Sequence, residues 1–197
     1  MTKQLGPAAH ARLSPSGSKR WMACAGSLTL EAPFPNKHNE YSDDGTAMHE
    51  VAAWCLTEHY RATKRVYDWI VVSREGEPVR KVQFTQEMAD LVQGYVDYVR
   101  FCGIGNELHV EQTLEFSEFV DEEDQFGTTD AGIVDRQRGE IAIIDLKTGH
   151  RPVDAEDNSQ LMIYALAFLG ELYRRAATPE GVLQAAIETS AADEDMV

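Results

Sequence analysis

Two carboxylates and a lysine in the second half of the chain have the residue types and spacing of a metal-assisted reaction centre. Asp145 and Lys147 stand two positions apart in the segment IIDLKTG, and Asp130 closes the segment GTTD. On paired strands Asp130 can lie beside Asp145, and two crowded carboxylates repel each other unless a proton or a cation separates them. Such oxygen ligands suit Mg²⁺ or Mn²⁺, and the lysine could hold an attacking water or neutralise a charged transition state. Taken alone, Asp145 and Lys147 could also form an ion pair at a sheet edge.

Two further segments carry polar residues that could join this centre. Gln160 and Tyr164 are four residues apart, so they share one face of a predicted helix, where they could also be a polar cap on a core helix. His49 and Glu50 end the segment GTAMHE at the start of another predicted helix. An imidazole suits Mn²⁺ and other transition metals, although a lone helical histidine is more often structural.

A sheet and several helices are needed to bring these residues together. Hydrophobic periodicity and turn residues predict helices over 17–24, 45–63, 85–101 and 156–176, strands over 107–116, 128–136, 139–147 and 181–188, and loops over 31–44, 73–80 and 117–126. Serines precede the first helix and suit N-capping, and 136–139 suits a hairpin turn. Alternation along the strand over 139–147 places Asp145 and Lys147 on one face. The order of elements indicates an α/β or α+β domain with a central sheet.

Composition predicts a single globular domain. The chain has 197 residues, of which 43% are hydrophobic and 26% are charged. Its net charge of −15 argues against a basic nucleic-acid coat protein and against a polybasic membrane binder. The same charge does not exclude an enzyme whose acidic groups hold metal ions.

Targeting signals and cysteine usage favour a cytoplasmic protein without a membrane partner. No apolar run reaches the roughly 18 residues of a membrane helix, and no apolar stretch typical of a signal peptide follows the first residues. The three cysteines, Cys24, Cys55 and Cys102, include no CxxC pair, which argues against a disulfide framework or a cysteine zinc site.

Charge divides the chain into three parts. Residues 1–40 contain five Lys or Arg and two Glu, a net +3, whereas the remainder carries −18. We therefore expect a basic N-terminal segment over 1–40 with a short helix, a core over 41–190 and an acidic tail over 191–197. The N-terminal segment is expected to be the only sizeable basic region, and it could contact DNA or be a solvated surface without a partner.

The ordered motifs resemble a known nuclease family. GTAMHE at 45–50, GTTD at 127–130, DLK at 145–147 and QLMIY at 160–164 are similar to motifs of the RecB-like branch of the PD-(D/E)XK nuclease superfamily, which includes lambda-type exonucleases. The run over 10–24 also resembles a phage and prophage family in that branch. The resemblance implies a restriction-endonuclease-like α/β core, with a central mixed β-sheet flanked by helices.

The resemblance also implies roles for individual residues. Asp130 and Asp145 would be metal-binding carboxylates and Lys147 the catalytic lysine, with His49 and the backbone carbonyl of Leu146 as further ligands. Active-site support or DNA contact is implied for Gln160, Tyr164 and Glu50. A group near the N-terminus could grip the 5′-phosphate end of a strand, although helix capping explains its serines equally well: Arg12, Ser14, Ser16, Lys19 and Arg20.

The function implied is a Mg²⁺- or Mn²⁺-dependent deoxyribonuclease, expected to be an exonuclease acting on DNA in phage or prophage recombination or DNA processing. Its expected setting is the cytoplasm of a bacterial cell, with a homo-oligomer or a recombination protein as a further partner. No cysteine follows Cys102, so no iron–sulphur cluster is expected, and no GxxxxGK[ST] loop indicates ATP use. The alternatives are an endonuclease, a hydrolase of another phosphate ester, and a non-catalytic DNA-end-binding or nuclease-inhibiting protein on the same fold.

Overall fold

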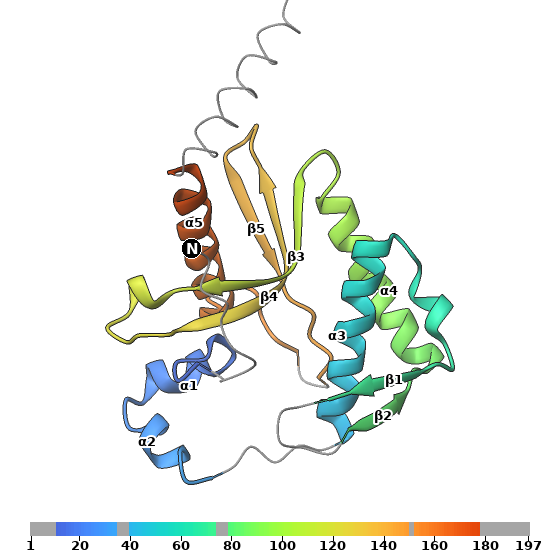
Figure 1. Ribbon diagram of the computed structural model, residues 1–197, viewed down its shortest axis with the longest axis horizontal. Coiled ribbons are helices and arrows are strands. Elements are labelled where there is room, and N and C mark those ends of the chain that lie inside the picture. The colour runs from blue at the N-terminus through green and yellow to red at the C-terminus, as the bar shows by residue number, and fades with distance from the viewer. Residues whose placement is uncertain (1–10, 35–39, 74–78, 150–151, 178–197) are drawn as a thin grey trace, which may run out of the picture.

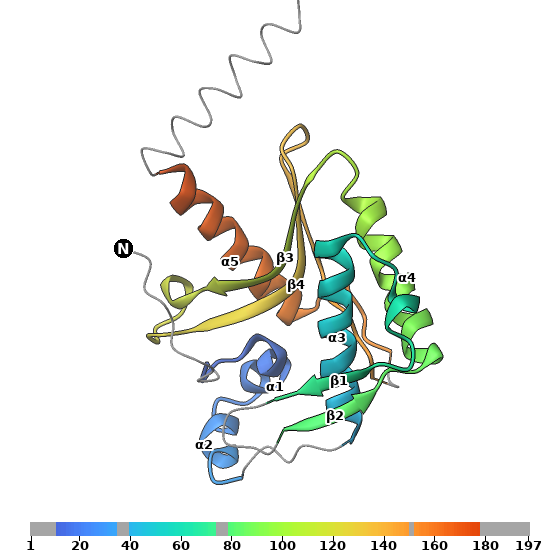
Figure 2. The ribbon, with the colours of Figure 1, turned by 45° about the vertical axis from the view of Figure 1, so that its right-hand side comes forward.

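A three-stranded antiparallel sheet lies between one helix on one side and two helices on the other (Figures 1 and 2). The computed structural model describes residues 11–34, 40–73, 79–149 and 152–177. Its helices and strands, in chain order, are α1 (Ser18–Ala23), α2 (Ser27–Glu31), α3 (Glu40–Glu58), β1 (Trp69–Val72), β2 (Arg80–Gln83), α4 (Gln86–Cys102), β3 (Glu107–Glu115), β4 (Phe126–Asp135), β5 (Glu140–Ile144) and α5 (Ser159–Ala176). Short 3₁₀ turns lie at Pro15–Gly17, Ala62–Arg65 and Ser117–Phe119.

The sheet has the order β3–β4–β5, and β1 and β2 form a separate two-stranded sheet. The predicted mixed α/β architecture is therefore confirmed, but the pairings among the described residues are all antiparallel, so the expected mixed sheet is not found there. The reason is that neighbouring strands follow one another directly, and a short connection can only join antiparallel strands. The turn after β4 is the predicted hairpin, with Gly139 at φ +67. The strand predicted over 181–188 lies outside the described residues.

The core forms on both faces of β4. Val51 and Cys55 of α3 pack with Val92 and Val96 of α4 in one buried cluster, which also includes Ala131 of β4. On the other face of the sheet, Ala167 and Phe168 of α5 pack in a second buried cluster with Leu114 of β3, Val134 of β4 and Phe116, which follows β3. The helices therefore hold the sheet by their apolar stripes, as the periodicity of α4 and α5 predicts.

Most predicted helices are present, with shifted ends. The first and third correspond to α1 and α4, and Thr85 caps α4 by accepting a hydrogen bond from Met88 N. Helix α3 extends over 40–58 instead of 45–63, so part of the loop predicted over 31–44 is helical. It stops before His59, whose φ of 57 is left-handed. Helix α5 begins only at Ser159, because Asn158 caps it.

Two local predictions are wrong, and one hairpin was not predicted. Ser14 makes no side-chain capping bond, and Gly17 occupies the position before α1. Strand β5 ends at Ile144, so Asp145 and Lys147 follow the strand instead of lying on it. The β1–β2 hairpin was not predicted, since each of its strands is only four residues long.

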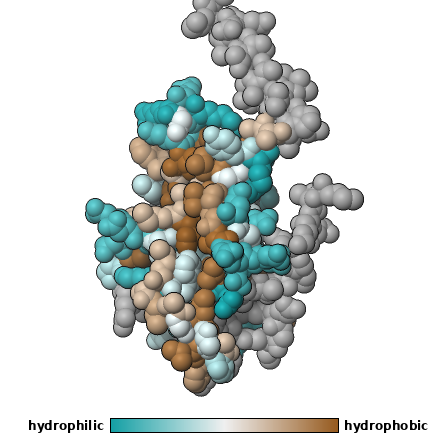
Figure 3. Space-filling view, turned by 90° about the vertical axis from the view of Figure 1, so that its left-hand side faces the viewer, coloured by the Kyte–Doolittle hydropathy of each residue, from teal (hydrophilic) through white to brown (hydrophobic). Residues whose placement is uncertain are grey.

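Helix α5 also has an exposed apolar stripe. Met162, Leu166, Leu169 and Tyr173 lie three or four residues apart, and each remains more than 40% exposed. Figure 3 shows apolar side chains gathered in a band over this side of the molecule. The expected homo-oligomer stays a prediction. Among the described residues, no helix has the length and apolar character needed to cross a membrane.

Candidate metal centre

Asp130 on β4 ties together three parts of the fold. Its Oδ1 lies 3.0 Å from His49 Nδ1 on α3, and its Oδ2 accepts a hydrogen bond of 2.6 Å from the amide of Leu146, just after β5. The Asp130 side chain is only 12% exposed, whereas that of His49 is 33% exposed. The sequence-predicted residues His49, Asp130 and Leu146 are therefore brought into direct contact.

Two motif glycines allow this close packing. A Cβ on Gly45 of α3 would lie 3.0 Å from Thr148 Oγ1, so the segment after β5 can lie directly against the helix that carries His49. A Cβ on Gly127 of β4 would lie 2.7 Å from Pro15 Cγ and 2.8 Å from Tyr164 Cε1. Any larger residue would push these neighbours away, because such contacts are shorter than van der Waals distance.

Asp145, Lys147 and Gln160 form a second cluster beside the first. Asp145 Oδ1 accepts a hydrogen bond of 2.8 Å from Gln160 Nε2, and Lys147 Nζ donates to Gln160 Oε1 at 2.8 Å. Lys147 Nζ also lies 2.7 Å from Asp145 Oδ2. The Asp145 side chain is 7% exposed and that of Lys147 is 40% exposed. The amide of Gln160 therefore fixes a buried carboxylate while the ammonium beside it still reaches solvent.

Glu111 on β3 belongs to the centre although no sequence motif marks it. One ligand atom each from His49, Glu111 and Asp130 lie within 4.8 Å of one another. In the β3–β4 register, Glu111 falls opposite Asp130, between the pairs Val110–Ala131 and Gln112–Thr129. Its φ of 50 interrupts the regular ladder at this position. Only the strand register could have predicted this residue.

The donor set of this group fits a divalent cation. One imidazole nitrogen and two carboxylate oxygens suit Mn²⁺ well and Mg²⁺ through the carboxylates. The hydroxyl of Tyr95 on α4 is buried and finds no hydrogen-bond partner among the described residues. Burial first, and then the charges of Asp130, Glu111 and Asp145, raise the pKa of Tyr95 well above its ordinary value. A water molecule bound to a cation among these acids would give the Tyr95 hydroxyl a hydrogen-bond partner, so the hydroxyl fits a site for a hydrated cation.

The ionisation of the acids and the histidine reflects their crowding. Burial, reinforced by the charge of Asp130, raises the pKa of Glu111 to about 7, even though its side chain is exposed on one side. Burial also raises the pKa of Asp145, against the opposing effect of Lys147. Burial alone would lower the pKa of His49, but the hydrogen bond and charge of Asp130 outweigh it and raise that pKa. A bound cation would relieve this repulsion.

Residues 10–174 match a family described as Protein of unknown function (DUF2800). The chain belongs to the DUF2800 family. No solved structure matches it. The match extends from just before the first described residue to the end of α5, so it includes every residue of both clusters in this DUF2800 protein.

The other predicted site residues divide into two groups. Tyr164 is buried next to Gln160 on α5, and burial raises its pKa to about 12. Ser16 and Lys19 line a cavity of about 650 Å³ with Lys147 and Gln160. The remaining ones are not brought to the clusters: Glu50 is exposed on α3, Ser14 accepts from Trp21 Nε1 through its carbonyl, and Arg12 and Arg20 pair with Glu122 and Glu31.

Cation affinity is expected to rise with pH in this DUF2800 protein. A ligand must lose its proton to bind a cation, and the pKa values of both Glu111 (about 7) and His49 are raised. Mn²⁺ binding should therefore tighten from about pH 5.5 to about pH 7.5, by up to roughly tenfold per pH unit for each proton released. Calorimetric titration at several pH values measures this. Glu111→Gln should bind more weakly with a shallower pH dependence, and equal affinity across the range would contradict the assignment.

Proposed function

We propose that this protein is a Mg²⁺- or Mn²⁺-dependent DNA nuclease, specifically an exonuclease that acts in phage or prophage recombination or DNA processing in the bacterial cytoplasm. The observation that carries the proposal is the meeting of two clusters. The group of His49, Glu111 and Asp130 could hold a cation, and the Asp145–Lys147–Gln160 cluster beside it presents an ammonium to solvent. The buried neighbours of the site residues, Met48, Ala131 and Leu146, belong to the apolar core, so the core holds both clusters in position.

Each cluster has a distinct task in phosphodiester hydrolysis. A bound Mg²⁺ or Mn²⁺ would supply charge neutralisation at the phosphate and lower the pKa of water. Lys147 can donate hydrogen bonds to the attacking water or to a phosphate oxygen, since its Nζ reaches solvent. Gln160 holds both Asp145 and Lys147, so the ammonium is positioned before substrate arrives.

The cavity next to Lys147 suits the end of a DNA strand. Ser16 and Lys19 from the N-terminal segment line it together with Lys147, and they can contact a terminal phosphate. Three acids, Asp154, Glu156 and Asp157, line the same cavity. A terminal phosphate would have to be held by Ser16, Lys19 and Lys147 against the repulsion of these acids. Our choice of exonuclease over endonuclease action rests on the similarity of the motifs to those of lambda-type exonucleases.

A non-catalytic DNA-end-binding or nuclease-inhibiting protein on the same fold is the second candidate. The net charge of −15 favours the nuclease-inhibiting form of this candidate, because an acidic surface can compete with DNA for a nuclease; the same charge disfavours DNA-end binding. Such a protein has no need of Lys147 held between Asp145 and Gln160, and for this reason we place it second.

Cleavage of end-labelled DNA separates these functions. The purified protein is incubated with Mg²⁺ or Mn²⁺ and with linear or covalently closed circular DNA. We expect loss of linear DNA only, and no loss when a chelator is present, because the proposed hydrolysis requires the cation. Cutting of circles would establish an endonuclease instead. A folded, cation-binding protein that cleaves neither substrate would contradict the nuclease proposal and favour the second candidate.

A further inference from the structure

The β1–β2 hairpin and the turn before it form a basic, aromatic surface outside both clusters. We call residues 60–72 and 79–83 the hairpin surface. It contains five Lys or Arg and one Asp, a net +4 in a chain whose net charge is −15. The N-terminal segment is therefore not the only basic region of the protein, and this one carries the higher charge.

Aromatic and basic side chains share the outer face of the hairpin. Val71 pairs with Lys81 and Trp69 with Gln83, so these four side chains lie on one face, while Ile70 and Val72 are buried on the other. Trp69 is 60% exposed, and Tyr67, which lies just before the strand, is 74% exposed. Trp69 therefore presents its ring to solvent on the same face of the hairpin as the Lys81 ammonium.

The turn before β1 holds two further cations over two other aromatic rings. Tyr60 stacks on Trp54 with 5.0 Å between ring centroids, and Lys64 Nζ lies 3.7 Å from the centre of the Tyr60 ring. Arg65 lies over the Trp54 ring at 5.2 Å. These contacts hold the positive charges in place at the surface, so less conformational entropy is lost when an anion binds.

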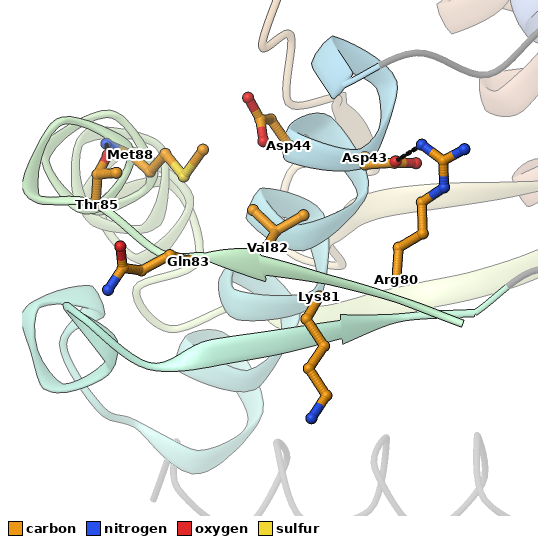
Figure 4. Close-up of a pocket in the computed structure, with 8 residues that line it drawn as sticks. All are labelled: Asp43, Asp44, Arg80, Lys81, Val82, Gln83, Thr85 and Met88. Atoms are coloured by element: carbon orange, nitrogen blue, oxygen red, sulfur yellow. Dashed lines mark hydrogen bonds and ion pairs between the residues drawn. The ribbon is translucent and has the colours of Figure 1, made fainter. Parts of the chain in front are cut away.

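The hairpin surface adjoins the candidate metal centre along α3. Arg80 Nη1 donates to Asp43 Oδ2 at 3.0 Å, and Asp43 lies two residues before Gly45, which packs against Thr148 of the segment that follows Lys147. A cavity of about 560 Å³ lies between β2 and the first turns of α3 and α4. Figure 4 shows Arg80 reaching toward α3, whereas Lys81 points away from that helix.

We propose that the hairpin surface binds a single-stranded segment of nucleic acid. Lys64 and Lys81 contact its phosphates, and Trp69 provides a platform on which a base stacks. A positively charged track with exposed aromatic rings is how proteins hold single strands, because every unpaired base offers a flat face for stacking. Bases inside a duplex are already stacked and cannot use such a ring. The inference rests on the proposed function in one respect: the nuclease proposal is the reason to expect that the strand bound here continues to the candidate metal centre.

Binding of a labelled single-stranded DNA oligonucleotide, measured by fluorescence anisotropy in chelator, tests this proposal without requiring catalysis. Lys81→Glu should weaken binding severalfold and reduce the salt dependence by about one unit of slope. Trp69→Ala should weaken it by about 5- to 100-fold, the usual effect of removing a stacking ring. The matched control is Arg138→Glu, an exposed charge in the β4–β5 turn at the opposite end of the molecule, which should leave affinity within about twofold.

The variants change exposed side chains, and unchanged thermal melting will show that they fold. The proposal is overturned if the protein does not bind the single strand, or if the Lys81→Glu and Trp69→Ala variants bind it as tightly as the control. It is also overturned if duplex DNA binds as well as the single strand and the Trp69→Ala substitution does not change the affinity for the duplex. Its failure differs from failure of the nuclease proposal. If the protein cleaves DNA but the Trp69→Ala variant binds the single strand normally, only the hairpin-surface proposal is refuted. If the protein binds the single strand through the hairpin surface but does not cleave DNA, only the nuclease proposal is refuted.

Discussion

Replacing Lys147 with alanine is expected to lower the rate of DNA cleavage by about 10²- to 10³-fold, the usual loss when one preorganised charged donor is removed. Lys147 is the cationic side chain placed between the carboxylate of Asp145 and the amide of Gln160. Without it, the negative charge that develops on the phosphate is no longer balanced by an ammonium. The protein should still fold, because this side chain is 40% exposed and contributes little to the core.

Initial rates on end-labelled linear DNA, at saturating Mn²⁺, measure this effect. Arg138→Ala is the matched control, since it removes a surface charge far from the site and should keep the wild-type rate. Gln160→Ala should lose less than Lys147→Ala, because Gln160 positions the ammonium and does not replace it. A Lys147→Ala protein that cleaves at the wild-type rate would remove the lysine from the mechanism.

The second large effect concerns Asp130. Asp130→Asn should abolish the thermal stabilisation that Mn²⁺ gives the wild-type protein, together with cleavage. Both carboxylate oxygens are in use, one against His49 and one accepting from the amide of Leu146, and an asparagine amide group can accept through only one atom. If the asparagine oxygen accepts from Leu146, its NH₂ group faces His49 Nδ1 and cannot accept from a protonated imidazole. The charge-assisted contact with protonated His49 is therefore lost, at a cost of about 1–3 kcal/mol in the free energy of unfolding.

The melting temperature with and without MnCl₂, in protein stripped of metal, separates the two consequences. Asp130→Asn should melt below the wild type in chelator and show no upward shift with MnCl₂. Glu50→Gln is the control: it removes a carboxylate from the residue next to His49, but one that is exposed. It should behave as the wild type in both conditions. Undiminished stabilisation of Asp130→Asn by Mn²⁺ would place the cation elsewhere.

The most regular elements could be predicted from local sequence because local forces decide them. The apolar stripe of α4, the Thr85 cap and the glycine of the β4–β5 turn each act within a few residues. The motif residues His49, Asp130, Asp145 and Lys147 are equally visible in the chain, since their types and spacing suggest their chemistry. What they do together requires contacts between residues that are distant in the chain, from 13 positions for Lys147 with Gln160 to 81 for His49 with Asp130.

Glu111 and the hairpin surface could not be predicted in this way. Glu111 has no motif, and it enters the centre because the β3–β4 register places it opposite Asp130. The β1 and β2 strands are four residues each, so their period-two patterns are too short to stand out from the surrounding chain. The end of β5 could not be predicted either. The alternating pattern predicts a strand that includes Asp145 and Lys147, but both residues follow the strand, which ends at Ile144.

The amino-acid sequence alone determined the chemical groups of this protein and the helices and strands that carry most of them, because side-chain type and short-range periodicity are properties of the chain itself. The tertiary structure alone decided which acid joins His49 and Asp130, which side chains hold Lys147, and where the basic hairpin lies relative to them. These depend on strand register and on close packing at Gly45 and Gly127, and such long-range contacts leave no local pattern in the chain.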